Sequence, residues 1–493
     1  MDQAHRTTAL SAKIGLSARE QWLLATLMLP SAMELIDSGM LAVALPRIQA
    51  DFGVPVDVLS WAVAAGFLPR VTLMPVYGHI GDLFGKKRLF VLGLTVFLVG
   101  ATLGIFAPSF SWLVVGRLLQ GLGSSSLPLA MALIAAEFPY DRRGRALGIW
   151  NTAAPVGIIL GPVLGGFIIN AFGWHAMFVF VSLGSALALA ATAWLLPETT
   201  SASARSGFDW VGAVSLMLVI LGLLLATTTE SLVPIGSPVN LAFWGISALA
   251  IVSLLRNARR KRDAFVGLDI LRNRRFMSPA LAVSLRMFAH DGARFLLALI
   301  LANVFRQSPR SVGVQMLFYA VPLMIGVATG GYLADRWASR VVGVVGMIGQ
   351  VAGLLWLAVA DASLGAAALV PGMIVAGLAS GMNLVALTKE AIGALGERRV
   401  GLASGLYNTI RFAGTAAATP LLGLLLASGF AQQGGDQTVS GPYQLAFGVA
   451  AGVAALGAVA AALIPAPAPT PTLPRAAGEG AKAPVSTRGG PSL

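Results

Sequence analysis

Charged side chains lie inside long apolar stretches of this 493-residue sequence. Glu34 and Asp37 are three residues apart, so on a helix they point along one face. Two carboxyl groups this close in a medium of low dielectric constant do not both ionise easily, and we expect at least one to hold a proton near neutral pH. Such a group suits a proton carrier. The alternative is that both acids form structural ion pairs with Arg70 or Arg117.

Basic side chains outnumber acidic ones in these stretches. Arg286, His290 and Arg294 are spaced by four residues and share one helical face, with Asp291 beside them. His290 is either a second proton site, because histidine titrates near neutrality, or a hydrogen-bonded core residue. The surplus of base favours an anionic or zwitterionic substrate. The opposing interpretation is that Asp291 neutralises Arg294 and that other arginines reach toward the membrane surface. The residues predicted to contact substrate are Arg70, Asn151, Arg286, Asp291, Arg294, Asn383, Asn408 and Arg411.

The composition excludes several classes of function. Apolar residues make up 56% and charged residues 11% of the chain, whereas soluble domains carry about a quarter charged residues. The lack of cysteine excludes disulfides, thiolate metal sites and a cysteine nucleophile. The four histidines, at positions 5, 79, 175 and 290, form no metal-binding pattern. No catalytic residue, metal or other cofactor is therefore expected, and a membrane-bound enzyme or a non-transporting receptor is disfavoured.

The apolar stretches predict a protein that crosses the membrane many times. A spanning helix needs about 20 apolar residues, and fourteen stretches qualify: 22–45, 58–80, 88–106, 111–137, 146–170, 174–196, 209–228, 239–256, 276–303, 311–334, 341–360, 364–390, 401–427 and 443–465. With both termini in the cytoplasm, most of the 34 Lys and Arg fall on the cytoplasmic side, while Arg47, Arg306 and Arg310 fall in external loops. The net charge of +13 thus reflects orientation, and no nucleic-acid partner is expected. The polar N-terminus is not a cleavable signal peptide.

A tight link between two predicted helices occurs twice. Its first copy runs from Gly78 to Arg88 and its second from Gly331 to Arg340. In the first copy Asp82 can accept hydrogen bonds or pair with a cation, Gly85 permits the positive φ of a sharp reversal, and Lys86 keeps the link cytoplasmic. Asp335 and Arg336 carry the same pattern in the second copy. The repetition predicts a duplicated bundle.

Both copies resemble the G-x-L-A-D-R-x-G-R-K signature between helices 2 and 3 of major facilitator superfamily transporters. Leu83 replaces the usual arginine, and Ala338 replaces the closing glycine, so the second turn is expected to be looser. Residues 36–46 are similar to the L-D-x-T-x-V-N-V-A-L-P motif of the fourteen-helix drug:proton antiporters, with Asp37 matching its acid. Residues 117–123 resemble R-x-x-Q-G-x-G-A. This resemblance implies that Arg117 tunes the acids electrostatically; its alternative role is to join two helices.

Residues 157–166 resemble the G-x-x-x-G-P-x-x-G-G motif of antiporters, which the family associates with export. Gly157, Gly161 and Gly165 share one face and offer a groove to a neighbouring helix, and Pro162 removes a backbone hydrogen bond and bends the helix. Such a helix suits rocking during alternating access. Asn408 and Arg411 also match an N-x-x-R pattern of these antiporters. The resemblance extends to about residue 465.

We therefore predict an all-α polytopic membrane protein with the major facilitator fold and fourteen transmembrane helices. A six-helix bundle (1–205), two inserted helices with a basic loop (206–262), a second six-helix bundle (263–466) and a disordered tail (467–493) make up the chain. The predicted function is export of small amphipathic compounds in exchange for protons, because no G-x-x-x-x-G-K-[ST] motif for ATP is present. The alternative is transport of an organic anion or metabolite. Expected partners are substrate, protons and the lipid of a bacterial inner membrane, with a periplasmic adaptor in a Gram-negative cell and a monomer as the working unit.

Overall fold

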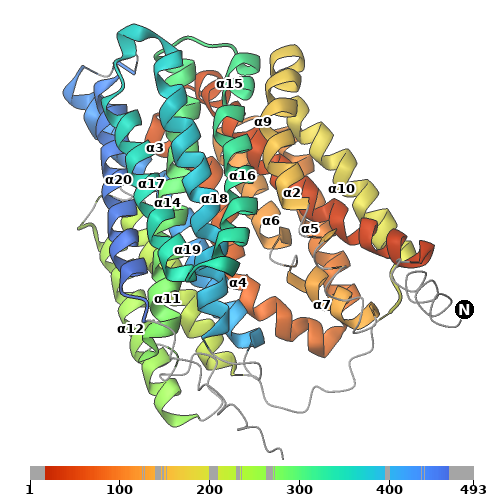
Figure 1. Cartoon of the computed structure of the whole chain (residues 1–493). Helices are drawn as coiled ribbons and strands as arrows, with labels where there is room; N and C mark the ends of the chain where they lie inside the picture. Colours follow the sequence, from red (N-terminus) through yellow and green to blue (C-terminus); the bar gives the residue numbers. More distant parts are fainter. Residues whose placement is uncertain are drawn as a thin grey trace, which may run out of the picture.

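The structure, a computed structural model, is helical throughout the residues that it describes (Figure 1). These residues are 17–124, 126, 128–138, 146, 149–150, 153–198, 209–228, 234, 236–261, 270, 272–394, 400–434, 436–437 and 439–465. Asn151 and the tail after residue 465 lie outside this set, as do the side chains of Asp82 and Asp335 and the surroundings of Gly78. The predictions made for those residues are therefore not addressed by the structure.

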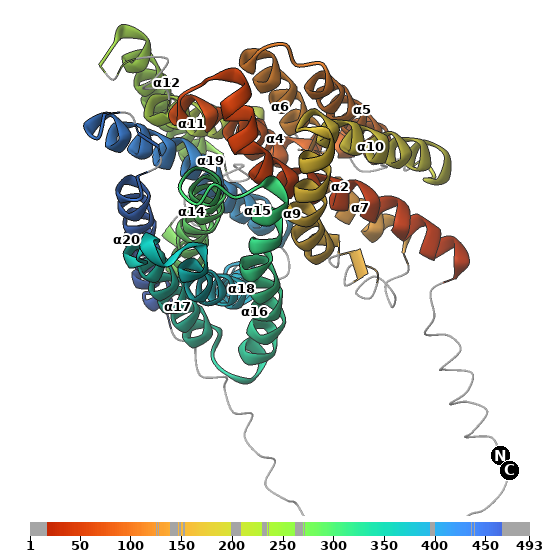
Figure 2. The same ribbon diagram turned by 90° about the horizontal axis from the view of Figure 1, so that it is seen from above.

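The first part of the chain supplies one group of packed helices. Its elements are α2 (Ala18–Phe52), α3 (Val56–Leu59), α4 (Trp61–Phe84), α5 (Lys86–Ile105), α6 (Phe110–Ser124), α7 (Pro128–Glu137), α9 (Ala153–Phe172) and α10 (His175–Leu195). The long α2 begins with a capping box in which the Ser17 side chain and Glu20 satisfy each other's backbone N–H groups. Two helices follow, α11 (Trp210–Thr228) and α12 (Pro238–Arg260), which pack on each other at one edge of the molecule (Figure 2).

The later part of the chain supplies a second group. Its elements are α14 (Arg274–Asn303), α15 (Pro309–Gln315), α16 (Leu317–Arg336), α17 (Ser339–Val359), η1 (Ala362–Leu364), η2 (Ala366–Leu369), α18 (Val370–Gly393), α19 (Val400–Gln432) and α20 (Gly441–Ala462). The helix pairs match those of the first group: α2 packs on α9 as α14 packs on α19, α4 on α6 as α16 on α18, and α5 on α6 as α17 on α18. The two halves thus repeat one packing scheme. The exact domain boundaries stay a prediction.

Every predicted span overlaps a described helix. Ten helices of the described residues have the length and composition to cross a membrane, and two shorter apolar helices accompany them. One detail of the prediction was wrong: Arg47 belongs to the last turns of α2 rather than to a loop. The predicted span 111–137 is covered by two helices, α6 and α7, with Ser126 in a turn between them. The count of fourteen spans and the side on which the termini lie stay predictions.

The two motif links differ as their sequences predict. In the first, Gly85 alone separates α4 from α5 and has φ +98°, which confirms the expected positive φ. Lys86 is the first residue of α5. In the second, Trp337 and Ala338 separate α16 from α17 with negative φ values. The second link thus reverses the chain with two residues and without a glycine. Beside it, the Arg336 guanidinium lies 4.4 Å from the Tyr332 ring centre.

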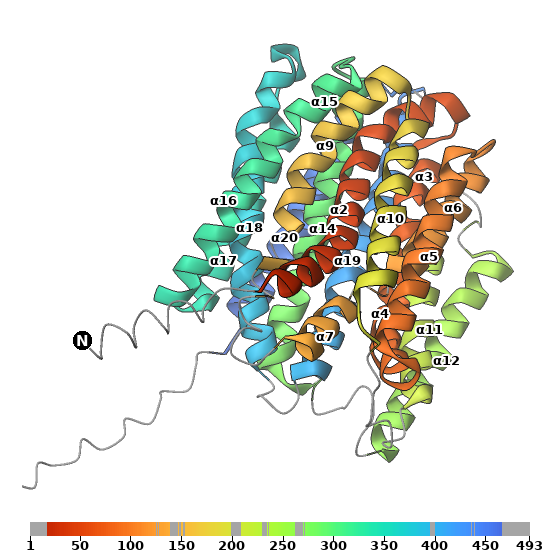
Figure 3. The same ribbon diagram turned by 90° about the vertical axis from the view of Figure 1, so that its right-hand side faces the viewer.

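Helix α9 is a wall shared by both halves (Figure 3). On one side Gly157, Gly161 and Gly165 lie against α2 so closely that a Cβ on Gly161 would stand 2.8 Å from the Gly39 Cα. This confirms the shared glycine face. On the other side a Cβ on Gly313 of α15 would stand 2.3 Å from the carbonyl oxygen of Pro162. Backbone thus meets backbone between the halves, at the end that the sequence predicts to be external.

Candidate substrate and proton site

The first half holds a fully buried ion pair midway along α2. Arg117 on α6 donates from Nη1 to Oδ2 of Asp37 over 2.6 Å, and the two side chains are 5% and 3% exposed. Gln120 accepts from the same Nη1 at 2.7 Å, and its Nε2 lies 3.4 Å from Asp37. Arg117 Nε also donates to the carbonyl of Ala62 on α4. One arginine therefore joins three helices around a single carboxylate.

A second ion pair lies about one turn away. Glu34 accepts a hydrogen bond from Nη1 of Arg70 on α4. The Arg70 guanidinium also lies 4.5 Å from the ring centre of Phe412, which belongs to α19 in the other half. Its Nε is buried and has no partner among the described residues. Arg70 thus links the first half to the second through one acid and one aromatic ring.

The second half holds a buried arginine that is surrounded by neutral groups. Arg286 on α14 is 2% exposed. Its Nε donates to the carbonyl of Ser380 and to Oδ1 of Asn383, each at 2.9 Å, and Nη2 donates to Oγ of Ser380. Gln350 accepts from Asn383 at 3.1 Å and extends this cage to α17. Among the described residues no carboxylate forms an ion pair with Arg286.

His290 lies one turn beyond Arg286 and belongs to the same hydrogen-bond network. Its Nδ1 is 2.8 Å from the Tyr319 hydroxyl and 3.2 Å from Oγ of Ser380. The imidazole is buried and packs 5.4 Å from the Tyr319 ring, centre to centre. This geometry is that of a hydrogen-bonded core histidine, and it also connects His290 to Arg286 through a single serine hydroxyl.

The remaining predicted residues gather on α14 and α19. Asp291 and Arg294 form an ion pair of 3.5 Å, as one of the two interpretations expected, and Thr415 donates to Asp291 at 2.8 Å. Arg411 lies 5.0 Å from the Phe412 ring centre, and its Nε is buried without a partner among the described residues. Asn408 is half-buried on the preceding turn.

Several contact residues have no counterpart in the sequence prediction. Ser380, Tyr319, Gln350 and Phe412 were not singled out, because single hydroxyl, amide and aromatic residues in an apolar helix stand out neither by charge nor by spacing. Among the neutral residues that contact the predicted ones, Gln120 differs because it belongs to the motif at residues 117–123. The structure groups the predicted residues into two clusters. The first half holds two ion pairs, and the second holds neutral hydrogen bonds around Arg286 and His290 beside the Asp291–Arg294 pair.

Charges held midway along apolar helices of two repeated bundles define a membrane transporter, since buried charge in a membrane is expensive and serves a transport path or a proton relay. Comparison with known proteins agrees. The Major Facilitator Superfamily profile matches residues 27–419 and, in a second match, 279–490. The chain belongs to the Major Facilitator Superfamily, and it is a multi-pass membrane transporter of bacterial type rather than an enzyme.

The relatives confirm the predicted resemblance to drug-efflux members of the superfamily. "Multidrug resistance protein Stp" of Mycobacterium tuberculosis is 28% identical over 80% of this chain and 74% of its own length. The "Probable actinorhodin transporter" of Streptomyces coelicolor is 31% identical over 80% of this chain and 70% of its own. Among solved structures, the POT family transporter PepTSo superposes with a TM-score of 0.65 at 15% identity, over 90% of this chain and 97% of that one, which shows the fold alone.

Proposed function

We propose that this transporter exports small amphipathic compounds in exchange for protons by alternating access. The observation that carries the proposal is the buried ion pair of Asp37 and Arg117. The similarity of the chain to proteins named as multidrug and antibiotic exporters supports it. A carboxylate that is buried and held by one arginine is a group whose charge can be switched by a proton. Protonation removes the attraction and leaves Arg117 with its neutral acceptors Gln120 and Ala62.

The arrangement supports a simple coupling scheme. When Asp37 binds a proton, α6 and α2 lose their ion pair, and the helices that Arg117 joins become free to separate. When the proton leaves, the pair forms again and draws them together. Glu34 provides a second carboxylate on the same face, and His290 is the candidate proton site of the other half. The glycine face of α9, with Gly157 and Gly161, is then the surface on which α9 moves against α2, and Pro162, which meets Gly313 of the other half, lies where the two halves rock.

The test is dye transport into inside-out vesicles driven by an imposed proton gradient. Wild-type protein should accumulate a lipophilic cationic dye, and collapse of the gradient by a protonophore should release it. Asp37→Asn should abolish accumulation while the protein still folds, because the amide is nearly isosteric and still accepts from Arg117. Transport at the wild-type rate by this variant would move the coupling role to Glu34 or His290.

A second candidate function, transport of an organic anion or metabolite, is favoured by one feature. Arg70 and Arg411 come from opposite halves, both face the ring of Phe412, and each has a buried Nε without a partner among the described residues. An anionic group placed between them would accept from both. Growth of an efflux-deficient host on anionic and cationic antibiotics separates the candidates: protection against anions alone, lost in Arg411→Gln, favours the anion transporter.

The other partners belong to the same proposal. Protons and a small-molecule substrate bind within the membrane, the monomer is the working unit, and an adaptor is needed only where an outer membrane must be crossed. Arg286, Asn383, Asn408, Asp291 and Arg294 are proposed to surround the substrate from the second half. Gly78, Asp82, Gly85, Lys86, Asp335 and Arg336 are proposed to control closure at the cytoplasmic end.

A further inference from the structure

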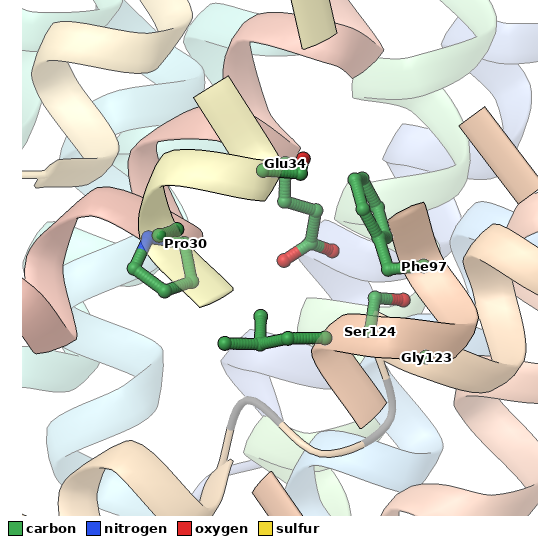
Figure 4. A pocket seen from close by; sticks show the side chains of 8 residues that line it. Pro30, Glu34, Phe97, Gly123 and Ser124 are labelled. Atoms are coloured by element: carbon green, nitrogen blue, oxygen red, sulfur yellow. The ribbon is translucent and has the colours of Figure 1, made fainter. Parts of the chain in front are cut away.

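A small void lies inside the first half, behind the Glu34–Arg70 pair. Its walls come from α2 (Pro30 and Glu34), α5 (Leu94 and Phe97), α6 (Gly123 and Ser124) and α10 (Ser185 and Ala188). Figure 4 shows the Glu34 carboxyl group directed into the space between Pro30, Phe97 and Ser124. The void is thus separate from the interface between the halves, where Arg70 meets Phe412.

The void has the size of a site for one water, and its largely apolar wall includes the polar side chains of Glu34, Ser124 and Ser185. It offers about 10 Å³ to the centre of a water molecule, which is about the room that one ordered water needs. Ser185 is 1% exposed, and its hydroxyl has no hydrogen-bond partner among the described residues. Ser124 donates to the carbonyl of Gly121 at 3.1 Å, which leaves its oxygen free to accept. Glu34 uses one carboxyl oxygen for Arg70.

We infer that this void binds one water molecule that bridges the Glu34 carboxyl group to the hydroxyls of Ser185 and Ser124. The inference rests on the proposed proton coupling, and it assigns Ser185 as a positioning residue. While Glu34 is ionised, the Ser185 hydroxyl donates to the water, and the water donates to the carboxylate and to Ser124. When Glu34 carries a proton, it donates to the water, which then donates to both serine oxygens.

The water gives Glu34 a hydrogen-bond partner in both of its protonation states. The charged groups that act on Glu34 are Arg70 from α4, Arg117 from α6 and Asp37 on its own helix. At the void, α5 and α10 supply only apolar groups and the Ser185 hydroxyl. Without the water, a protonated Glu34 that had released Arg70 would be a buried polar group without a hydrogen-bond partner, which is unfavourable. With it, Glu34 can exchange its ion pair for a proton.

The water itself is tested by X-ray hydroxyl-radical labelling, which oxidises buried side chains only where bound water is converted to radicals beside them. Phe97 is 6% exposed and lines the void. We expect it to be labelled in the full-length wild type and to lose most of its label in Ala188→Val, which fills the void but keeps every hydroxyl. An unlabelled Phe97 in the wild type, or equal labelling in Ala188→Val, would overturn the inference.

The role is tested by substrate-driven proton movement in proteoliposomes, with dye binding measured separately. Ser185→Ala and Ala188→Val should slow proton movement about tenfold, with unchanged dye affinity. The matched control is Ser182→Ala on the same helix, whose hydroxyl is also buried without a partner but does not line the void. Equal rates in Ser185→Ala and wild type, or equal slowing in Ser182→Ala, would refute the role. A wild type that moves no protons would refute the proposed function, while the labelling result would still decide the water.

Discussion

The two halves of the molecule pack their helices alike but balance their buried charge in opposite ways. In the first half, an acid on the first span pairs with an arginine three spans later, as Asp37 on α2 pairs with Arg117 on α6. In the second half, the first helix carries the arginine, and Arg286 donates hydrogen bonds to Ser380 and Asn383 on α18. At these matching positions a proton can remove the charge of Asp37 in the first half, whereas Arg286 in the second half keeps its charge. The carboxylate of the second half, Asp291, lies elsewhere on α14 and pairs with Arg294.

The Asp37–Arg117 pair and the cage around Arg286 differ in whether a proton can change their charge. The ion pair of the first half exists in two states because a carboxylate can be neutralised, whereas a guanidinium stays charged throughout the physiological range. The cage of neutral acceptors around Arg286 is thus a fixed structure. The first half is expected to respond to protons, and the second to hold position or attract an anion.

The largest difference in stability should appear between two single variants, one at Arg117 and one at Arg286. Arg117→Gln leaves the buried Asp37 carboxylate without its cation and should lower the free energy of unfolding by about 3–5 kcal/mol. Arg286→Gln removes three hydrogen bonds, but it also removes a buried charge that has no counterion among the described residues. These effects oppose each other, so the net cost should be only about 1 kcal/mol. Melting temperatures in detergent measure both.

The double variant Asp37→Asn with Arg117→Gln is the control, because it removes both charges and should recover most of the loss. An Arg286→Gln protein that melts as low as Arg117→Gln would mean that the second half also depends on charge balance.

The next effect concerns the contact between the halves at α9. Gly313→Ala places a methyl group against the Pro162 carbonyl, so it should force the halves apart at that end and favour the state open there. The chain has no cysteine, so a single Ser60→Cys reporter can be labelled selectively by a membrane-impermeant maleimide. Ser60 is buried against Gly423 of the other half, and the reagent reaches it when the halves separate there. We expect labelling to be several-fold faster in Gly313→Ala.

Gly245→Ala is the matched control, since nothing lies within 4 Å of a Cβ at that helical glycine. Labelling that rises equally in both variants would show that the effect is not specific to the contact at α9.

A smaller effect separates the two motif links. Gly85→Ala must place an L-residue at φ +98° and should lower stability by about 1–3 kcal/mol. Ala338→Gly in the corresponding link meets no such constraint and should cost less than about 1 kcal/mol. Melting temperatures of the two variants give the comparison, and equal losses would contradict the link geometry described for the two halves.

The smallest effect should come from Tyr319→Phe, which removes the hydroxyl beside His290. A neutral hydrogen bond is worth about 1 kcal/mol, so the melting temperature should fall slightly while the pH profile of transport stays unchanged. A pH profile that shifts in Tyr319→Phe and flattens in His290→Gln would instead make His290 a proton site and remove the asymmetry between the halves.

The sequence predicted the charged part of the site well, because a charge in an apolar helix is visible without a structure. Ion pairs of Glu34 and Asp37 with Arg70 or Arg117 were the alternative to a proton-carrying role, and the Asp291–Arg294 pair was the interpretation that opposed an anionic substrate. Each of these pairs is formed. Helix lengths and the repeated link also gave the fold class. The break between α6 and α7 was missed although Pro128, at the first residue of α7, is a typical helix start.

Of the neutral part of the site, Asn383 was named from the sequence, but its other members could not be predicted. Ser380, Tyr319 and Gln350 surround Arg286 and His290 only because α16, α17 and α18 meet α14 in space, and no local pattern encodes that meeting. The same is true of Ser185, whose hydroxyl matters only because a void of suitable size lies beside it. A residue such as Ser185 is found in the structure because its buried hydroxyl lacks a hydrogen-bond partner among the described residues.

The cage around Arg286 has a consequence for how the protein is made. Helix α14 carries Arg286, Asp291 and Arg294, and it is absent from the set of described helices whose composition alone suits a membrane span. An arginine at the centre of an inserting helix costs about 2.5–3.5 kcal/mol. The acceptors that compensate it, Ser380 and Asn383, are synthesised more than 90 residues later. Stable insertion of α14 must therefore wait for α18, so a chain truncated before α18 should fail to retain α14 in the bilayer.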